Sequence, residues 1–377
     1  MTHAIDIIPL PFNRPGTGRS LRLHRFGRPG AGPKAYVQAG LHAGELPGML
    51  VALDLVAKLA ALDAAGQVRG EVLVLPLANP IGFDQVFQGR LLGRFELGGG
   101  VNFNRAYADL TDAVERRVRG QLGLDAATNV ALVRQALRDS VAELVPQTDA
   151  DALRKLLLGF AVDADVMLDL HCDSDAVMHL YTGTELWPGF ADLSARLGCH
   201  AALLAGESGG DPFDEACSSV WWKLRARLPD GIPLPPACAA TTIELRGEAD
   251  VDDTQAKADA DAILDHLRVR GVLAGTPAPL PAALCEGTPL AGVDRVRAPV
   301  AGVIAYHAAL GDRVEAGQVV ADIVDPWSGE RFPCRAQAAG PVWSRRLERF
   351  ATAGEVVMSI AGTEPLKEEG SGLLTAR

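Results

Sequence analysis

The sequence predicts an α/β domain followed by a small all-β domain, and two observations carry this prediction. The apolar run 36–39, helical spacing of apolar residues over 49–62 and the continuous apolar run 71–77 form a strand–helix–strand unit. Such a unit implies a parallel strand pair joined by a right-handed crossover. Near the C-terminus, the segment AGQVVADI at 316–323 recurs as AGEVVMSI at 353–360. Short β-branched runs doubled between glycine turns are typical of a small, pseudosymmetric β fold.

The remaining segments complete the α/β pattern and suggest its boundaries. Residues 20–24 alternate as a half-buried strand, and residues 106–160 are expected to form helices that cover the sheet or a lid. We expect further strands at 166–170, 176–181, 201–205 and 239–245, and further helices at 213–228 and 254–270. The expected organisation is an α/β domain over 1–275 with a helical insertion at about 106–160, a linker at 276–290, an all-β domain at 291–362 and a tail at 363–377.

The amino-acid composition restricts the classes of molecule that this protein is expected to bind. The net charge of -11 argues against a nucleic-acid surface, which would need clustered Lys and Arg. We expect no signal peptide, because the first residues lack a basic segment followed by an apolar core. We also expect no membrane span, because no uncharged apolar run is long enough. The six cysteines lack paired spacing and are expected to be reduced thiols in a cytoplasmic protein. The sequence leaves the oligomeric state open, a homo-oligomer included.

A short stretch after the first buried strand carries the main chemical signal. In Gly40–Glu45, with the sequence GLHAGE, His42 and Glu45 stand three positions apart between small residues. A catalytic zinc takes three protein ligands from nitrogen and carboxylate donors and keeps one position open. One turn bearing His-x-x-Glu would supply two of the three ligands. As alternatives, His42 could be an ordinary loop residue and Glu45 a first-turn carboxylate favoured by the helix dipole.

Three later motifs join this stretch: NFNR at 102–105, DLH at 169–171 and TIEL at 242–245. With them, the sequence resembles the succinylglutamate desuccinylase/aspartoacylase family, relatives of the zinc carboxypeptidases, over residues 20–270. The resemblance implies a mixed, mostly parallel sheet with helices on both faces. It also implies one Zn²⁺ per chain, held by His42, Glu45 and His171.

The resemblance assigns further roles to the same motifs. Glu244 would act as general base and acid, and Arg105, helped by Asn104, would bind a substrate carboxylate or polarise the scissile carbonyl. One of Arg94 and Arg90 is expected to reach the substrate, with Arg94 preferred. A guanidinium matches a carboxylate in bidentate geometry, which suits these roles. The alternatives are Glu248 for Glu244, a core position for His171, and a structural ion pair for Arg105.

Two features depart from related patterns. Asn102 stands where many family members carry an Asp that would orient a zinc histidine, so the imidazole would receive less charge. Asp169, beside His171, is a candidate to compensate. Residues 291–362 resemble the barrel-sandwich hybrid fold of biotinyl and lipoyl carriers, but this segment contains no lysine to carry a cofactor. The C-terminal domain is therefore expected to wall the active site or to mediate assembly.

These observations favour a zinc-dependent hydrolase that removes the acyl group from an N-acyl amino acid or a similar small amide. A metallocarboxypeptidase acting on peptides is the alternative within catalysis. A zinc- or ligand-binding protein on the same fold, without activity, is the alternative outside it.

Overall fold

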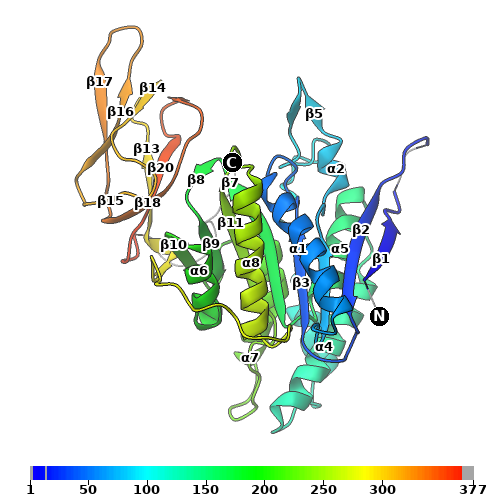
Figure 1. Cartoon of the computed structure of the whole chain (residues 1–377). Coiled ribbons are helices and arrows are strands. Elements are labelled where there is room, and N and C mark those ends of the chain that lie inside the picture. Colours follow the sequence, from blue (N-terminus) through cyan, green and yellow to red (C-terminus); the bar gives the residue numbers. More distant parts are fainter. Residues whose placement is uncertain (1–2, 13–14, 367–377) are drawn as a thin grey trace.

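The computed structural model describes residues 3–12 and 15–366, and its centre is a nine-stranded sheet (Figure 1). The α/β fold with a mixed sheet is therefore confirmed. Across the sheet, the strands follow the order β1 (Ala4–Pro9), β2 (Ser20–Gly27), β4 (Glu71–Leu75), β3 (Lys34–Ala39), β7 (Val166–Asp173), β11 (Ala239–Gly247), β9 (His179–Gly183), β10 (Ala201–Ala205) and β12 (Gly287–Pro289).

Strand direction divides this sheet into two parts. The central strands β4, β3, β7 and β11 are parallel, so their carboxyl ends meet at one edge. Strand β9 is antiparallel to β11, and β9, β10 and β12 are parallel to one another. Strand β12 lies within residues 276–290, for which the sequence predicts a linker. Ligands of open α/β sheets bind beyond the carboxyl ends of parallel strands, which is where the sequence motifs gather.

Helices cover both faces of the sheet. On one face, α1 (Pro47–Ala64) and α8 (Asp253–Val269) pack side by side, with α6 (Ala191–Leu197) next to α8 (Figure 1). Pro47 begins α1, where a missing amide hydrogen costs nothing. Asp252 caps α8 by accepting hydrogen bonds from the amides of Thr254 and Gln255.

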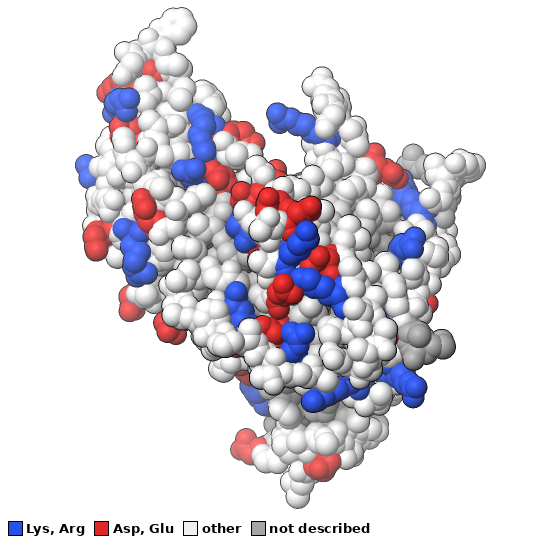
Figure 2. All heavy atoms as spheres, viewed as in Figure 1, with Lys and Arg blue, Asp and Glu red and all other residues white. Residues whose placement is uncertain are grey.

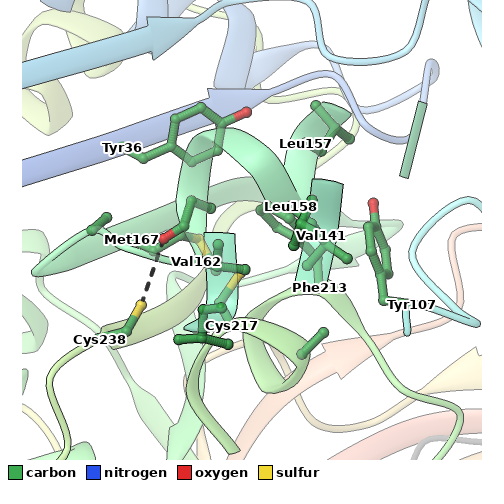
Figure 3. Close-up of a cluster of buried hydrophobic side chains, with 14 of the residues drawn as sticks. Tyr36, Tyr107, Val141, Leu157, Leu158, Val162, Met167, Phe213, Cys217 and Cys238 are labelled. Carbon is green, nitrogen blue, oxygen red and sulfur yellow. Dashed lines mark hydrogen bonds between the residues drawn. The ribbon is translucent and has the colours of Figure 1, made fainter. Parts of the chain in front are cut away.

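The other face carries the helices expected over 106–160 together with α7. They are α3 (Thr111–Val118), α4 (Ala126–Glu143), α5 (Asp149–Ala161) and α7 (Phe213–Arg225). Thr148 and Asp151 form a reciprocal capping box at the start of α5. Figure 3 shows the core beneath them, where Phe213 of α7 and Tyr107 lie beside Val141 and Leu157. This packing holds the start of α7 against the loop that contains Asn104 and Arg105.

Short elements line the edge where the central strands end. A one-turn helix, α2 (Pro80–Phe83), is capped by Asn79 and leads into a hairpin of β5 (Val86–Phe87) and β6 (Arg90–Leu91). Short 3-10 helices, η1 (Thr184–Gly189) and η2 (Leu290–Gly292), follow β9 and β12.

The C-terminal part consists of two antiparallel sheets, as the repeat predicts. The repeated glycines Gly317 and Gly354 have φ values of 86° and 85°, and each turn leads into a corresponding strand. One sheet has the order β13 (Val293–Arg297), β20 (Val356–Ala361), β18 (Gly340–Arg345), β15 (Arg313–Val314), and the other β17 (Arg331–Arg335), β16 (Val319–Val324), β14 (Gly302–Tyr306), β19 (Phe350–Ala351). Of the tail expected over 363–377, residues 367–377 lie outside the described part.

Backbone pairing joins the C-terminal sheets to the α/β part. Strand β8 (Asp175–Ala176), which follows β7, pairs with β18, and the Val177 amide donates to the Trp343 carbonyl at 3.0 Å. The Asp175 carboxylate also accepts hydrogen bonds from Arg345 and Arg349. The C-terminal sheets are thus held directly over the carboxyl end of β7.

The surface shows where this arrangement leaves space. Figure 2 shows a hollow between the C-terminal sheets and the β5–β6 hairpin, with acidic and basic side chains interspersed over the face below. Residues from both sides of the hollow, including Arg94 and Arg346, line one pocket. Over the described ranges 3–12 and 15–366, the structure has no helix with the length and apolar character that a membrane crossing requires.

Candidate active site

A sharp turn at the end of β3 presents the first two candidate ligands. Gly40 has a φ of +69°, a backbone conformation that favours glycine, and it redirects the chain between β3 and α1. The Glu45 amide then donates to the His42 carbonyl at 3.2 Å, which closes a tight turn. His42 and Glu45 are each only 3% exposed. The turn therefore fixes both side chains at the edge of the sheet.

His171 completes a cluster that could hold a metal ion. One carboxylate oxygen of Glu45 lies 2.8 Å from Nδ1 of His42, and the other lies 2.7 Å from Nδ1 of His171. One ligand atom from each of the three residues falls within 4.8 Å of the others. Two imidazoles and one carboxylate are a donor set found around catalytic zinc. The residues present therefore fit such an ion.

Outer partners fix both imidazole rings. The Asn102 side-chain oxygen accepts a hydrogen bond from Nε2 of His42 at 2.8 Å, and it also accepts from the Asn104 amide. Nε2 of His171 lies 3.0 Å from Oδ2 of Asp169, whose other oxygen accepts from Gln38. Both Nδ1 atoms thus face Glu45. The partner of the His42 ring is the amide of Asn102, whereas the partner of the His171 ring is the carboxylate of Asp169. The two rings therefore receive unequal electrostatic support.

Electrostatics at this cluster favour a bound cation. Burial lowers the pKa of His42, so this ring is neutral near pH 7. If the single ring proton of His42 is on Nε2 and is donated to Asn102, the lone pair of Nδ1 points at the Glu45 carboxylate. Burial disfavours the charged form of His171, but Asp169 and Glu45 outweigh burial and raise its pKa well above the usual value. A cation between these atoms would remove the repulsion of lone pair and carboxylate.

Glu244 lies next to His171 because β11 and β7 pair in register at these two residues. Its Oε2 atom is buried and has no hydrogen-bond partner within the described chain. Burial and then the charge of Glu45 raise the pKa of Glu244 to about 8. Glu248, the alternative, is exposed and lies beyond the bulge after Glu244. A carboxyl with a raised pKa beside a metal cluster suits proton transfer.

The predicted substrate-binding residues lie at the same pocket. Nη1 of Arg94 donates to Glu45 at 2.8 Å and lies 3.4 Å from Nδ1 of His42. The side-chain oxygen of Asn104 accepts a hydrogen bond from the Phe213 amide at 2.9 Å, and this bond links the pocket loop to α7. Arg105 lines the pocket beside Asn104. Arg90 is exposed on β6 and is not among the lining residues.

The pocket extends from the metal cluster across one face of the sheet and has a volume of about 390 Å³. Thr242 of β11, Tyr181 of β9 and Leu203 of β10 form its floor. Strands β18 and β20 cover it through Trp343 and Met358, among other residues. Such a volume lies within the usual range for small-molecule sites.

Several lining residues lie outside the motifs predicted from the sequence. Near the start of α7 these are Ser208, Asp214 and Glu215, and from the C-terminal sheets they include Arg295 and Trp343. The only sequence signal near the first group is Gly209-Gly210-Asp211-Pro212, a turn-rich run before a helix.

Cys172 does not look like a ligand or nucleophile. Its thiol is 2% exposed, and burial raises its pKa far above the usual value. Its backbone amide instead lies 3.3 Å from Glu45 and donates to the carboxylate. All six cysteines lie in the described part and are free thiols.

Comparison with known proteins agrees with this geometry. Residues 31–130 match the family model of the succinylglutamate desuccinylase/aspartoacylase catalytic domain. No curated protein sequence matches the chain. The matched segment includes His42, Glu45 and Arg105 but ends before His171 and Glu244.

Solved structures share the fold over nearly the whole chain. A protein from Shewanella frigidimarina described as a succinylglutamate desuccinylase/aspartoacylase superimposes with a TM-score of 0.84 at 25% identity, covering 96% of this chain and 98% of its own. A family protein from Shewanella amazonensis gives 0.82 at 26% identity, covering 95% and 98%. The product-bound ectoine utilization protein EutE from Ruegeria pomeroyi, at 16% identity and a TM-score of 0.68, covers 96% of both chains and shares the fold alone.

Proposed function

We propose that this chain is a zinc-dependent hydrolase of a small N-acyl amino acid or similar amide, because residues 31–130 match the succinylglutamate desuccinylase/aspartoacylase catalytic domain and its fold is shared with solved structures described in those terms. Water would add to the acyl carbon and the C–N bond would break, which releases a carboxylic acid and an amine. The single observation that carries the proposal is the buried cluster of His42, Glu45 and His171 at the inner end of a closed-in pocket.

His42, Glu45 and His171 would hold the ion through two Nδ1 atoms and the carboxylate. When bound, Zn²⁺ supplies Lewis acidity and lowers the pKa of a water ligand toward about 7. Asn102 and Asp169 would keep the two rings in the orientation that points each Nδ1 at the cluster. A pre-oriented set avoids reorganisation of the ligands when the ion binds.

Glu244 would accept a proton from the attacking water and pass it to the departing nitrogen. Its Oε2 atom, which has no other hydrogen-bond partner in the described chain, is available for this transfer. Burial raises the pKa of Glu244, which favours its taking up a proton and returning it to the leaving nitrogen. The same residue can then act as base and as acid in one cycle.

The arginines would complete the site. Arg94 lies within reach of the cluster, so its guanidinium would stabilise negative charge that develops on the carbonyl oxygen. Arg105 and Asn104 would orient a carboxylate of the substrate. A bound ion and Arg94 would share Glu45 as a partner, so Arg94 is free to turn toward substrate once the ion neutralises that carboxylate.

The cover over the pocket favours small substrates over peptides. Strands β18 and β20 close the side that an extended peptide would need, through Trp343, Arg345 and Met358. Trp343 is 4% exposed and packs against His179 in a tilted arrangement with ring centroids 4.5 Å apart, so it is a fixed part of the wall. We therefore favour deacylation over a carboxypeptidase activity.

The test is hydrolysis by the zinc-loaded full-length protein across N-acyl amino acids and blocked dipeptides. We expect turnover of acyl amino acids, its loss on chelation, and recovery when about one equivalent of zinc is returned. Faster cleavage of peptides would favour the carboxypeptidase. Stoichiometric zinc without turnover of any amide would contradict an enzyme and favour a binding protein.

A further inference from the structure

We propose that Gln38 and Tyr36 are positioning residues for the metal cluster, because they hold Asp169 in the orientation that supports the ring of His171. Both residues lie on β3, before the GLHAGE motif, and neither belongs to the motifs that mark the site in the sequence. The inference rests on the zinc ion of the proposed function, and it assigns a role to two side chains that would not touch that ion.

The sheet brings four polar side chains into one row. Side chains two positions apart on a strand point to the same face, so Tyr36 and Gln38 of β3 share a face, as do Asp169 and His171 of β7. The register of the two parallel strands places Gln38 directly opposite Asp169. The row therefore crosses from one central strand to the next and ends at a candidate metal ligand.

The distances along this row are those of direct contacts. The Tyr36 hydroxyl donates to Oε1 of Gln38 at 2.8 Å, and Nε2 of Gln38 donates to Oδ1 of Asp169 at 2.9 Å. Oδ2 of Asp169 lies 3.0 Å from Nε2 of His171, close enough for an ion pair, although the angles are not those of a hydrogen bond. Nδ1 of His171 faces Glu45 at 2.7 Å. The phenol is thus connected to the metal cluster through side chains alone.

The chemistry of the groups permits only one direction for these hydrogen bonds. An ionised carboxylate can only accept, so Gln38 must turn its NH₂ group toward Asp169. Its carbonyl oxygen then faces Tyr36, whose hydroxyl must donate. Within residues 3–12 and 15–366, Gln38 is the one hydrogen-bond donor to Oδ1 of Asp169. The orientation of the carboxylate therefore depends on the amide, and that of the amide depends on the phenol.

Burial makes this dependence strong. Tyr36, Gln38 and Asp169 are each 0% exposed, and His171 is 2% exposed. Bulk water cannot reach these groups to replace a lost partner, and polar contacts in a buried, weakly screened environment are strengthened. A buried carboxylate that loses its donor would turn toward another one. Such a movement would take Oδ2 away from the His171 ring.

The other imidazole of the cluster is supported in a different way. The Asn102 oxygen that faces Nε2 of His42 also accepts a hydrogen bond from the backbone amide of Asn104 at 2.8 Å. A backbone donor remains in place whatever the side chain. The support of His171 instead depends on the side chains of Gln38 and Tyr36, so substitution can remove it without changing any ligand of the ion.

A purely structural role for the row makes a different prediction. Buried polar groups are normally hydrogen-bonded, and the row could exist only for that reason. Tyr107 provides the comparison, because Tyr36 and Tyr107 are both buried and both pack against Phe213, with ring centroids 6.2 and 5.0 Å away. The Tyr107 hydroxyl has no hydrogen-bond partner within the described chain. Only the Tyr36 hydroxyl is therefore connected to the cluster.

The experiment measures the zinc dissociation constant of the full-length protein by competition with a chromophoric chelator. Gln38→Met keeps a side chain of similar length without the donor, and we expect zinc to bind roughly 10–100-fold more weakly, the usual effect of losing an outer partner. Tyr36→Phe should cause a smaller loss in the same direction. Tyr107→Phe, the matched control, should keep the wild-type constant.

A double variant tests whether Tyr36 acts through Gln38. If it does, adding Tyr36→Phe to Gln38→Met should weaken zinc binding no further, whereas two independent effects would add. The visible absorption of bound Co²⁺ provides a readout of ligand geometry that packing alone does not change. We expect an altered spectrum in Gln38→Met and the wild-type spectrum in Tyr107→Phe.

Circular dichroism of the metal-free proteins identifies variants that fold, and Tyr36→Phe, which removes one atom, is the test if Gln38→Met does not fold. An unchanged zinc constant in folded Gln38→Met, or equal losses in Tyr36→Phe and Tyr107→Phe, would overturn the inference. These results are independent of hydrolysis. Weakened zinc binding in a protein that cleaves no amide would support the inference and contradict only the proposed function.

Discussion

The pocket contains two groups of charged residues. In the candidate metal cluster, which we call the inner end, each imidazole nitrogen of His42 and His171 faces a defined partner, and Glu45 is shared between the two rings. At the start of α7, which we call the outer end, Asp214 and Glu215 form no ion pair among the described residues, although the charge of Arg105 lowers the pKa of Asp214. The inner end therefore has the geometry of an ion site, whereas the outer end presents two neighbouring carboxyls whose pKa values are raised to about 6 and about 7.

This contrast distinguishes the residues that would catalyse hydrolysis from those that would select the substrate. Residues that would activate water are held by the turn after β3 and by adjacent central strands, which are rigid and buried. Residues that would read the substrate lie on the loop before α7 and on the C-terminal sheets. Loops on a rigid scaffold change more readily than the scaffold does, so relatives can share the first set and differ in the second.

The largest expected effect comes from removing a ligand of the inner end. His171→Ala should reduce bound zinc from about one equivalent to a small fraction and abolish turnover, because a catalytic zinc relies on three protein ligands. Metal analysis after dialysis measures this. His200→Ala, a partly exposed histidine outside the pocket, is the matched control and should keep full zinc. Full zinc in His171→Ala would contradict the ligand assignment.

The next effect tests the proton-transfer role at the inner end. Glu244→Gln should keep zinc and lower kcat by roughly 10²–10⁴-fold, because an amide cannot accept the proton. Steady-state kinetics and metal analysis of the same sample measure both quantities. Glu248→Gln is the control. If Glu248→Gln alone causes the comparable loss, the role belongs to Glu248.

A smaller effect should follow from weakening the outer support of His42. Asn102→Ala removes the oxygen that accepts from Nε2 of His42, and we expect zinc affinity to fall by roughly 10–100-fold. Competition with a chromophoric chelator gives the dissociation constant. An unchanged constant would show that the ring keeps its orientation without this bond, and would weaken the account of the inner end as a pre-oriented site.

The wall formed by the C-terminal sheets should affect selectivity. Trp343→Ala removes a buried side chain that packs against His179, and should cost roughly 3–5 kcal/mol of stability by cavity formation. We expect the ratio of kcat/KM for acyl amino acids over blocked dipeptides to fall, because the opened wall admits longer substrates. Trp327→Ala, at an exposed hairpin tip, is the control. An unchanged ratio in a folded Trp343→Ala protein would assign the C-terminal sheets to another role.

Sequence patterns predicted the inner end because its residues lie in short motifs at strand ends. The motif GLHAGE needs its glycine for a positive φ, and β7 and β11 are buried strands that carry His171 and Glu244 near their carboxyl ends. Such local rules are readable from one chain. The expected sheet, the flanking helices and the C-terminal antiparallel sheets followed from the same periodicities.

The outer end depended on long-range contacts that no local pattern encodes. Asp214 and Glu215 look like ordinary first-turn carboxylates until the packing of α7 and the C-terminal sheets buries them in a pocket. Trp343 comes from a strand more than a hundred residues away along the chain and becomes part of the wall only through pairing of β18 with β8. The hairpin β5–β6 and the edge strands β1 and β12 were also not predicted, because they are short or lie in segments with weak alternation.

The most direct test of the central claim is anomalous diffraction at the zinc absorption edge from crystals of zinc-loaded Glu244→Gln protein. We predict one strong peak bonded to Nδ1 of His42, Nδ1 of His171 and the Glu45 carboxylate at about 2.0–2.2 Å. A zinc peak bonded to other residues, or no peak at this cluster in a fully loaded crystal, would contradict the account.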